Sequence, residues 1–249
     1  MKIYVINLLR SIDRLIAISR QSVKFNFSFE RVDAIDGKKL NFEPTNTIQD
    51  IQALRCVTKS EIACNWSHAK ALELIANGDE DYGIILEDDA ILSPKCEYFF
   101  KNTDWIPANT NLIKLDTGCK KVLFNNARQI NAEYKLYDRL TNDYRATGYL
   151  VSKEAARWLA AKIYETNILI DVIMYNFVEG MACDLNAMQL YPAIVTNEDG
   201  NLSTITHAKR HRTLWKTITR LPKHLAYKRY LQRFWKPHQY ICTYIPFLK

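Results

Sequence analysis

Short apolar runs recur along the chain, with polar segments between them. Several are rich in β-branched residues and end at a Gly, Pro or acidic turn, which is typical of buried strands. The runs that we interpret as strands cover residues 2–8, 27–35, 82–86, 111–116, 145–151 and 190–195. Three consecutive carboxylates, Glu87, Asp88 and Asp89, directly follow the run at 82–86.

Helical periodicity is found between these runs. Thr58 and Glu61 have the spacing of a capping box, and apolar residues then recur every three or four positions until Gly78. Ser152 is a suitable N-cap for a second helix, whose apolar face comprises Ala155, Ala156, Leu159 and Ile163. A shorter helix is predicted to begin near Arg10. The mixture of strands and helices predicts an α/β fold.

The distribution of charge divides the chain into two parts. The net charge is +7, but residues 200–249 hold eleven Lys and Arg and no Asp or Glu, so the remainder is net acidic. We therefore predict a body of residues 1–206 and a basic, aromatic extension of residues 207–249.

The extension also has a helical pattern, with Leu214, Ile218, Leu221 and Leu225 at steps of four, three and four residues. Pro222 should divide it into two short helices. Basic helices with Trp and Leu on the other face are typical of elements that lie on an anionic membrane. The alternative is a helix pair that packs on the body with its charges in solvent.

The cysteines are scattered and form no C-x-x-C pair, which favours free thiols in a reducing compartment. They are Cys56, Cys64, Cys96, Cys119, Cys183 and Cys242. No apolar run is long enough to span a bilayer, and the run at residues 3–9 is too short for a signal peptide. We expect a cytoplasmic protein that is soluble or attached to a surface.

The acidic cluster at the end of the 82–86 strand is the strongest candidate for chemistry. In open α/β folds, ligands bind at the carboxyl ends of the strands. Three adjacent carboxylates repel one another, so a cation or strong hydrogen-bond donors should lie nearby. A divalent metal held against a phosphorylated ligand is one interpretation, and a solvated acidic turn is the other.

Three further positions have both a functional and a structural interpretation. Asp171 interrupts an apolar stretch, where a charge needs a partner or a function, but it could also cap a helix over residues 172–178. His68 lies one residue off its helix's apolar face and is either an ordinary helical histidine or a ligand-facing group. Asn7 and Arg14, near the first strand-to-helix turn, could hold a base or phosphate, although arginines are common at helix starts.

Six blocks occur in an order that resembles a known family. They are KIYVINLLRSIDR, FERVDAIDG, the pair Ser67-His68, ILEDDAILS, LIKLDTG and ATGYLVSKEAARWL. Together they resemble glycosyltransferase family 25, the bacterial lipooligosaccharide glycosyltransferases, over roughly residues 1–206.

The resemblance implies a GT-A type fold, a nucleotide-sugar donor, inversion at the anomeric carbon and a divalent metal such as Mn²⁺. The family's acidic motif matches Glu87, Asp88 and Asp89, with Asp89 and then Glu87 as the first choices for coordination. A bound metal would neutralise the charge that develops on the diphosphate leaving group. Folds of this type often recruit a late histidine, for which His207 is the candidate, although His207 could equally be a solvent-exposed residue of the extension.

The resemblance also suggests residues for the donor and for the base. Those that match the nucleotide-lining part of the family pattern are Asn7, Arg14, Asp33, Asp36 and Gly37, and further donor- or acceptor-side assignments are His68, Lys114, Thr147 and Gly148. An inverting enzyme needs a base for the acceptor hydroxyl, and Asp171 is the candidate.

The predicted function is transfer of a hexose, galactose from UDP-galactose, onto a lipooligosaccharide acceptor. A glucosyl- or N-acetylglucosaminyltransferase is the alternative within the same pathway. A glycoside hydrolase would need two carboxylates across the scissile bond, and the clustered acids do not supply that pair. The basic extension could suggest nucleic-acid binding, but the acidic body and the lack of a motif argue against it. Such an acceptor implies a peripheral position on the cytoplasmic face of the inner membrane.

Overall fold

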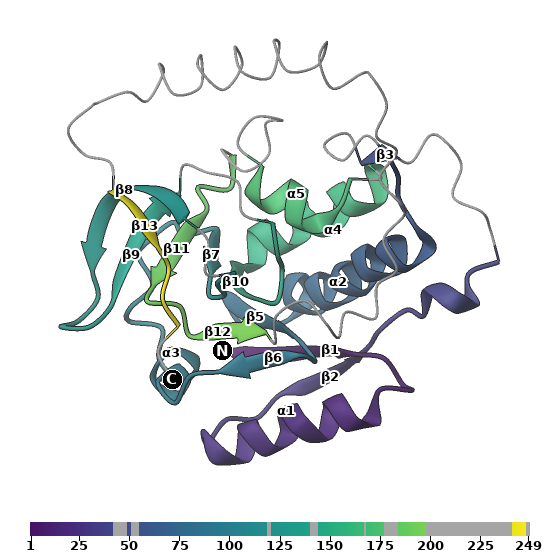
Figure 1. Cartoon of the computed structure of the whole chain (residues 1–249), viewed down its shortest axis with the longest axis horizontal. Helices are drawn as coiled ribbons and strands as arrows, with labels where there is room; N and C mark the ends of the chain where they lie inside the picture. Colours follow the sequence, from purple (N-terminus) through teal and green to yellow (C-terminus); the bar gives the residue numbers. More distant parts are fainter. Residues whose placement is uncertain are drawn as a thin grey trace, which may run out of the picture.

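The computed structural model describes residues 1–41, 49–50, 55–118, 121–139, 144–166, 168–176, 184–197 and 241–247. Its largest sheet has nine strands in the described part of the chain (Figure 1). In spatial order they are β13 (Ile241–Tyr244), β8 (Lys121–Gln129), β9 (Lys135–Arg139), β11 (Met188–Tyr191), β7 (Leu112–Lys114), β10 (Gly148–Ser152), β5 (Tyr82–Glu87), β1 (Lys2–Asn7) and β2 (Glu30–Asp33).

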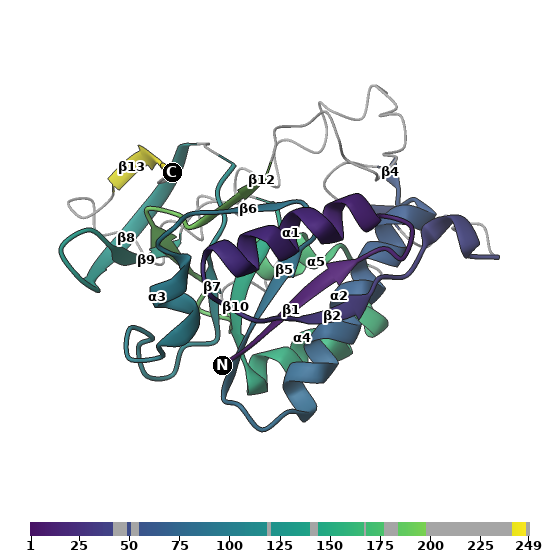
Figure 2. The same ribbon diagram turned by 90° about the horizontal axis from the view of Figure 1, so that it is seen from below.

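Helices cover both faces of this sheet (Figures 1 and 2). The helices are α1 (Ile12–Lys24), the 3₁₀ turn η1 (Gly37–Lys39), α2 (Lys59–Asn77), α3 (Cys96–Lys101), α4 (Lys153–Glu165) and α5 (Ile170–Tyr175). Short strand pairs are formed by β6 (Ala90–Leu92) with β12 (Val195–Asn197) and by β3 (Gln49–Asp50) with β4 (Arg55–Cys56). The expectation of an α/β fold is confirmed.

Strand alternation explains why the central strands are apolar throughout. Ile85 packs with the core that α2, α4 and α5 share, whereas Ile84 and Leu86 pack with the core on the side of α1 and α3. Because successive side chains of a strand point to opposite faces, a strand covered on both faces needs a continuous apolar run. Glu87, the residue after Leu86, therefore lies on the α2 side of the sheet.

The parallel part of the sheet brings three strand ends together. β1 pairs in parallel with β2 on one side and with β5 on the other, with Asn7 opposite Asp33 and Ile6 opposite Glu87. β10 then runs antiparallel between β5 and β7. The carboxyl ends of β1, β2 and β5 consequently share one edge of the sheet, as predicted for the acidic run.

The predicted helix ends are confirmed. The Thr58 side chain accepts a hydrogen bond from the Glu61 backbone N–H and the Glu61 side chain accepts one in return, which is the capping box. Ser152 accepts from the backbone N–H of Ala155 at the start of α4, and α2 ends at Gly78. Local hydrogen bonds at these positions can be read from the sequence because they join residues three apart.

Two strand predictions need correction. The run at 27–35 forms a strand only over Glu30–Asp33, and the run at 190–195 divides into β11 and β12 around Pro192. The antiparallel strands β8 and β9 were not predicted. β8 is largely polar, and its exposed half has no alternating apolar pattern that would reveal it.

The predicted extension is described only at residues 241–247, and these residues join the body. β13 pairs antiparallel with β8, Ile245 is buried, and the Thr117 hydroxyl donates to the Ile245 carbonyl at 2.9 Å. His207 and the predicted basic helices lie outside the described residues. Across the described segments, no helix is both long and apolar enough to cross a membrane.

Candidate functional site

The acidic turn after β5 lies beside the ends of β1 and α1, and Asp88 is bound to both. The Asn7 side-chain amide donates to Asp88 Oδ2 at 2.8 Å, and Arg14 Nη1 donates to Oδ1 at 3.1 Å. Burial raises the pKa of Asp88, although these two hydrogen bonds oppose that effect. Both oxygens of Asp88 therefore accept hydrogen bonds that hold the turn in place.

Asp89 has a different environment. Its Oδ1 is buried and has no hydrogen-bond partner among the described residues, and its Oδ2 lies 4.0 Å from Arg14 Nη1. Burial, followed by the charge of Glu87, raises the pKa of Asp89 to about 7. A buried carboxylate oxygen without a donor is destabilising unless a cation or a ligand donor meets it.

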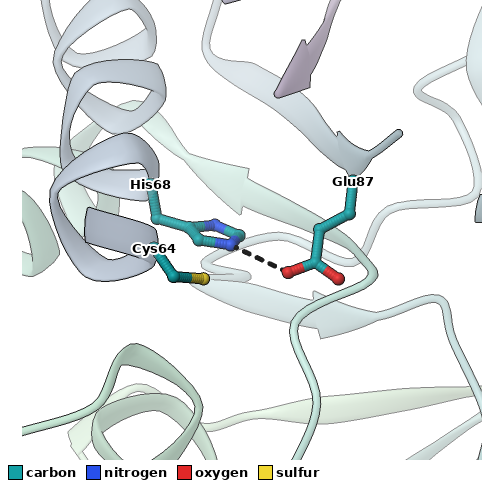
Figure 3. Close-up of side chains that lie close together, drawn as sticks. All are labelled: Cys64, His68 and Glu87. Atoms are coloured by element: carbon teal, nitrogen blue, oxygen red, sulfur yellow. Dashed lines mark hydrogen bonds and ion pairs between the residues drawn. The ribbon is translucent and has the colours of Figure 1, made fainter. Parts of the chain in front are cut away.

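Glu87 is in hydrogen-bond contact with a buried histidine of α2. His68 is fully buried on α2, and its Nε2 lies 3.3 Å from Glu87 Oε1 (Figure 3). Its Nδ1 lies 3.0 Å from the hydroxyl of Tyr149 on β10. Burial raises the pKa of Glu87, but hydrogen bonds from His68 and Thr147 and the charge of Lys114 outweigh it, so the net direction is downward. Glu87 is therefore ionised and held by His68.

These carboxylates fit a divalent cation. Carboxylate oxygens are the ligands that Mg²⁺ and Mn²⁺ prefer. The groups that could hold the ion are the Asp89 Oδ1, which has no partner within the described segments, and the ionised Glu87 carboxylate. Asp88, between them in sequence, fixes the turn through its hydrogen bond from Asn7. The ion's charge would lower the pKa of Asp89 and remove the repulsion from Glu87.

Arginines surround the neighbouring strand ends. Arg31 Nε donates to the Asn7 side-chain oxygen at 3.0 Å, and its Nη2 pairs with Asp33 at 2.9 Å. Arg10 forms an ion pair with Asp36. Both guanidinium groups are therefore paired with carboxylates at this edge of the sheet, and guanidinium groups are also the side chains that bind phosphate oxygens in pairs. Arg31 was not among the predicted site residues. In the β1–β2 register it lies opposite Val5, two positions before Asn7, so only the pairing of the strands brings it near Asn7.

Three predicted donor-side residues have structural roles in the fold. A Cβ on Gly37 would lie 2.7 Å from Ser60 Cα, so Gly37 is needed for close packing of η1 against α2. A Cβ on Gly148 would lie 2.9 Å from a Val195 side-chain carbon. Thr147 is buried, and its carbonyl accepts from the Glu87 backbone N–H at 2.9 Å. These contacts position Glu87 and the strand ends around it.

Lys114 is fully buried and has partners on three sides. Its Nζ lies 2.5 Å from Asp116 Oδ1, donates to the Arg145 carbonyl at 2.6 Å, and sits 4.2 Å from the centre of the Tyr175 ring. Asp116 in turn accepts from the Gly148 backbone N–H at 3.2 Å. Lys114 therefore influences Glu87 through its charge, and its ion-pair partner Asp116 is hydrogen-bonded to β10 at Gly148.

Asp171 lies in the first turn of α5 and is half-buried. Its Oδ1 accepts from the Val172 backbone N–H at 2.8 Å. The helix begins at Ile170 after Leu169, so the expectation that Asp171 caps a helix over 172–178 is wrong. The charges of Glu87, Asp171 and Asp89 all raise the pKa of the Cys64 thiol, after burial as the main cause. Asp171 thus lies within electrostatic range of the same thiol as Glu87 and Asp89.

Cys64 and Tyr149 belong to the site but were not predicted. Cys64 lies four residues before His68 on α2, so the two side chains project from the same face of the helix (Figure 3). That spacing was visible in the sequence, whereas Tyr149 reaches His68 only through the tertiary fold. Cys64 and Cys96 are free thiols, as predicted.

The fold and the site together define a class of protein. It is a mixed α/β protein with carboxylates and arginines gathered at the carboxyl edge of its parallel strands, where such sheets bind nucleotides. The model of glycosyltransferase family 25 (LPS biosynthesis protein) matches residues 1–174, so the chain belongs to this family of transferases.

Curated relatives agree with the family match. The lipooligosaccharide biosynthesis protein lic2B of Haemophilus influenzae is 24% identical over 261 residues, which cover 94% of this chain and 97% of the relative. The lipooligosaccharide biosynthesis protein lex-1 of Haemophilus influenzae (strain ATCC 51907 / DSM 11121 / KW20 / Rd) is 23% identical over 219 residues, which cover 78% of this chain and 72% of the relative.

A solved structure also aligns with the chain. It is a glycosyltransferase involved in the glycosylation of the major capsid of PBCV-1, with a TM-score of 0.38 and 10% identity. The alignment covers 93% of this chain and 100% of that chain.

Proposed function

We propose that this chain is an inverting, metal-dependent glycosyltransferase of the GT-A type that transfers galactose from UDP-galactose to a lipooligosaccharide acceptor. The names of the two curated relatives support the acceptor class. The observation that carries the chemistry is the buried Oδ1 of Asp89, to which no residue in the described part of the chain donates a hydrogen bond, together with the ionised Glu87.

The donor diphosphate would lie at the shared edge of β1, β2 and β5. Asp89 and Glu87 would hold a divalent cation there, which as a Lewis acid would neutralise charge on the leaving diphosphate. Arg14 Nη1, at 3.1 Å from Asp88 and 4.0 Å from Asp89, would offset the repulsion between these two carboxylates. Arg10 and Arg31 would add positive charge for the nucleotide.

The acceptor would enter from the side of α5. Its hydroxyl oxygen attacks the anomeric carbon while the bond from that carbon to the diphosphate oxygen breaks, and the electron pair leaves with UDP. The hydroxyl proton passes to the Asp171 carboxylate. A single displacement of this kind inverts the configuration at the anomeric carbon.

The test is a donor panel with the purified full-length chain. UDP release is measured for UDP-galactose, UDP-glucose and UDP-N-acetylglucosamine, with truncated lipooligosaccharide as the acceptor and with Mn²⁺ or excess chelator. We expect acceptor-dependent release from UDP-galactose that stops in chelator and returns with Mn²⁺. Preference for another donor would reassign the sugar, and full activity in chelator would reject the metal mechanism.

A further inference from the structure

A second group of potential ligand atoms lies beneath the acidic turn. Cys64 Sγ, a ring nitrogen of His68 and a carboxylate oxygen of Glu87 all lie within 4.8 Å of one another. Figure 3 shows the thiol, the imidazole and the carboxylate directed toward a common point. Cys64 and His68 come from successive turns of α2, and Glu87 comes from the end of β5.

We propose that Cys64, His68 and Glu87 form a binding site for a thiophilic divalent cation such as Zn²⁺. A thiolate, an imidazole and a carboxylate are the three side-chain ligand types of zinc sites. Mg²⁺ and Mn²⁺ prefer oxygen ligands, so the cysteine would favour Zn²⁺ over the cation that Glu87 and Asp89 would hold.

The distances suit this ion. His68 Nε2 and Glu87 Oε1 are 3.3 Å apart, and two ligands at roughly 2.0–2.1 Å from a tetrahedral Zn²⁺ are separated by about 3.3 Å. The ion could therefore replace the hydrogen bond between them without moving either group apart. Cys64 Sγ lies within 4.8 Å of the other two ligand atoms, and a Zn–S bond of roughly 2.3 Å in the same tetrahedron would place it about 3.6 Å from each.

Tyr149 already provides the outer support that metal-binding histidines require. A histidine ligand is oriented by a hydrogen bond from its other ring nitrogen, and His68 Nδ1 lies 3.0 Å from the Tyr149 hydroxyl. On binding, His68 would change tautomer so that Nδ1–H donates to Tyr149 while Nε2 binds the ion. The Cys64 thiol proton would leave to solvent, and the ion would meet a thiolate.

Glu87 would be a ligand of both the Zn²⁺ site and the Mn²⁺ site at the acidic turn. If the proposed function holds, Zn²⁺ binding should therefore affect transfer. A Zn²⁺ ion bound to Cys64 and His68 would take the Glu87 carboxylate from the Mn²⁺ position. Zn²⁺ should therefore inhibit transfer in competition with Mn²⁺.

Binding is tested first without any activity measurement. Co²⁺ is titrated into the metal-free, full-length protein, and the thiolate-to-cobalt charge-transfer absorption in the near ultraviolet is recorded. We expect this absorption with wild type, its loss in Cys64→Ser and in Cys64→Ala, and its retention in Cys96→Ala, which removes the buried thiol of α3. Lack of the absorption in wild type, or its persistence in both Cys64 variants, would overturn the proposal.

Inhibition is then measured at fixed Mn²⁺ with increasing Zn²⁺. For Cys64→Ser, half-inhibition relative to the variant's own rate without Zn²⁺ should need at least about tenfold more Zn²⁺ than for wild type. Equal Zn²⁺ sensitivity of wild type and Cys64→Ser would overturn the inhibitory role. If the protein shows the cobalt–thiolate absorption but transfers no sugar from any donor, the cation site is supported and the proposed function is rejected.

Discussion

The three adjacent carboxylates Glu87, Asp88 and Asp89 have different hydrogen-bonding environments in this protein. Asp88 accepts hydrogen bonds on both oxygens from Asn7 and Arg14, Glu87 is hydrogen-bonded to His68, and Asp89 has a buried oxygen to which no described residue donates a hydrogen bond. Identical or similar side chains in sequence are therefore distinguished by their partners in space. A cation bound at this turn would depend mainly on Asp89.

The raised pKa of Asp89 predicts how stability depends on pH. Its folded pKa is about 7, well above the unfolded value of about 3.9, so the folded state binds the extra proton between these values. The free energy of unfolding of the metal-free protein should therefore fall as pH rises from about 4 to 7. Asp89→Asn should reduce this fall. Thermal unfolding in chelator across this pH range measures the difference.

Metal addition gives the complementary prediction. At pH 7, saturating Mn²⁺ should raise the melting temperature of wild type, because a ligand that binds only the folded state stabilises it. Asp89→Asn should show little increase and should abolish transfer, while Asp104→Asn, an exposed residue after α3, serves as the control. An equal Mn²⁺ shift in wild type and Asp89→Asn would contradict the ligand assignment.

Asp171 is tested by removing only its ability to take a proton. Asp171→Asn preserves shape and should lower the transfer rate by ~10²–10⁴ with little change in donor binding. Single-turnover rates and UDP-sugar affinity, measured separately, distinguish the two effects. If the variant transfers at the normal rate, the proton goes to another group.

At the scale of elements, the site depends on how α2 is placed against the sheet. α2 supplies His68 below Glu87, while η1 packs on its first turn through Gly37. The Ser67 hydroxyl accepts from the Ile35 backbone N–H at 2.8 Å, which ties α2 to the segment after β2. The helix thus connects the β2 edge with the carboxylate at the end of β5.

Gly37→Ala tests this packing. The added Cβ would meet Ser60 Cα at 2.7 Å, so the backbone of η1 or α2 must shift, at a cost of about 1–3 kcal/mol in the free energy of unfolding. Gly78→Ala is the comparison variant and should cost less, because its Cβ would come no closer than 3.0 Å to its nearest neighbour, the Leu74 carbonyl oxygen, which needs a smaller shift. Denaturant unfolding compares the two. A smaller loss for Gly37→Ala than for Gly78→Ala would contradict the packing argument.

At the scale of the whole molecule, acidic and basic parts of the chain are separate in sequence but joined in the fold. β13, within the basic extension, forms the edge strand next to β8, so the extension is part of the sheet at residues 241–244. Removing everything after residue 206 would therefore also remove a strand. We propose that the basic segment of residues 207–240 holds the enzyme at an anionic membrane surface.

Charge neutralisation tests this membrane proposal without truncation. The triple variant Lys228→Gln, Arg229→Gln and Arg233→Gln should bind vesicles of phosphatidylglycerol and phosphatidylethanolamine up to about 100-fold more weakly, since each basic residue contributes about 1 kcal/mol near such a surface. Wild-type binding should also weaken with salt. The control variant neutralises Arg20, Lys24 and Lys95 on the body. Equal binding of wild type and the tail variant would reject the proposal.

The sequence alone determined the features that local chemistry controls. The apolar run at 82–86, the capping box at Thr58 and the N-cap at Ser152 depend on residues close together in the chain, and each was predicted correctly. The position of the acidic cluster at a strand end followed from the same local pattern. β8 and β9 were missed because polar antiparallel strands acquire their identity from their partners rather than from their own periodicity.

Only the tertiary structure decided which acidic residue has which environment. Asn7 and Arg14 reach Asp88 across more than seventy positions of sequence, and His68 and Tyr149 come together from a helix and a distant strand. Burial and hydrogen-bond partners set the pKa and the free coordination sites of a carboxylate, and both are properties of the packed molecule. The chain order therefore predicted where the chemistry lies, and the packing determined which atoms remain available for it.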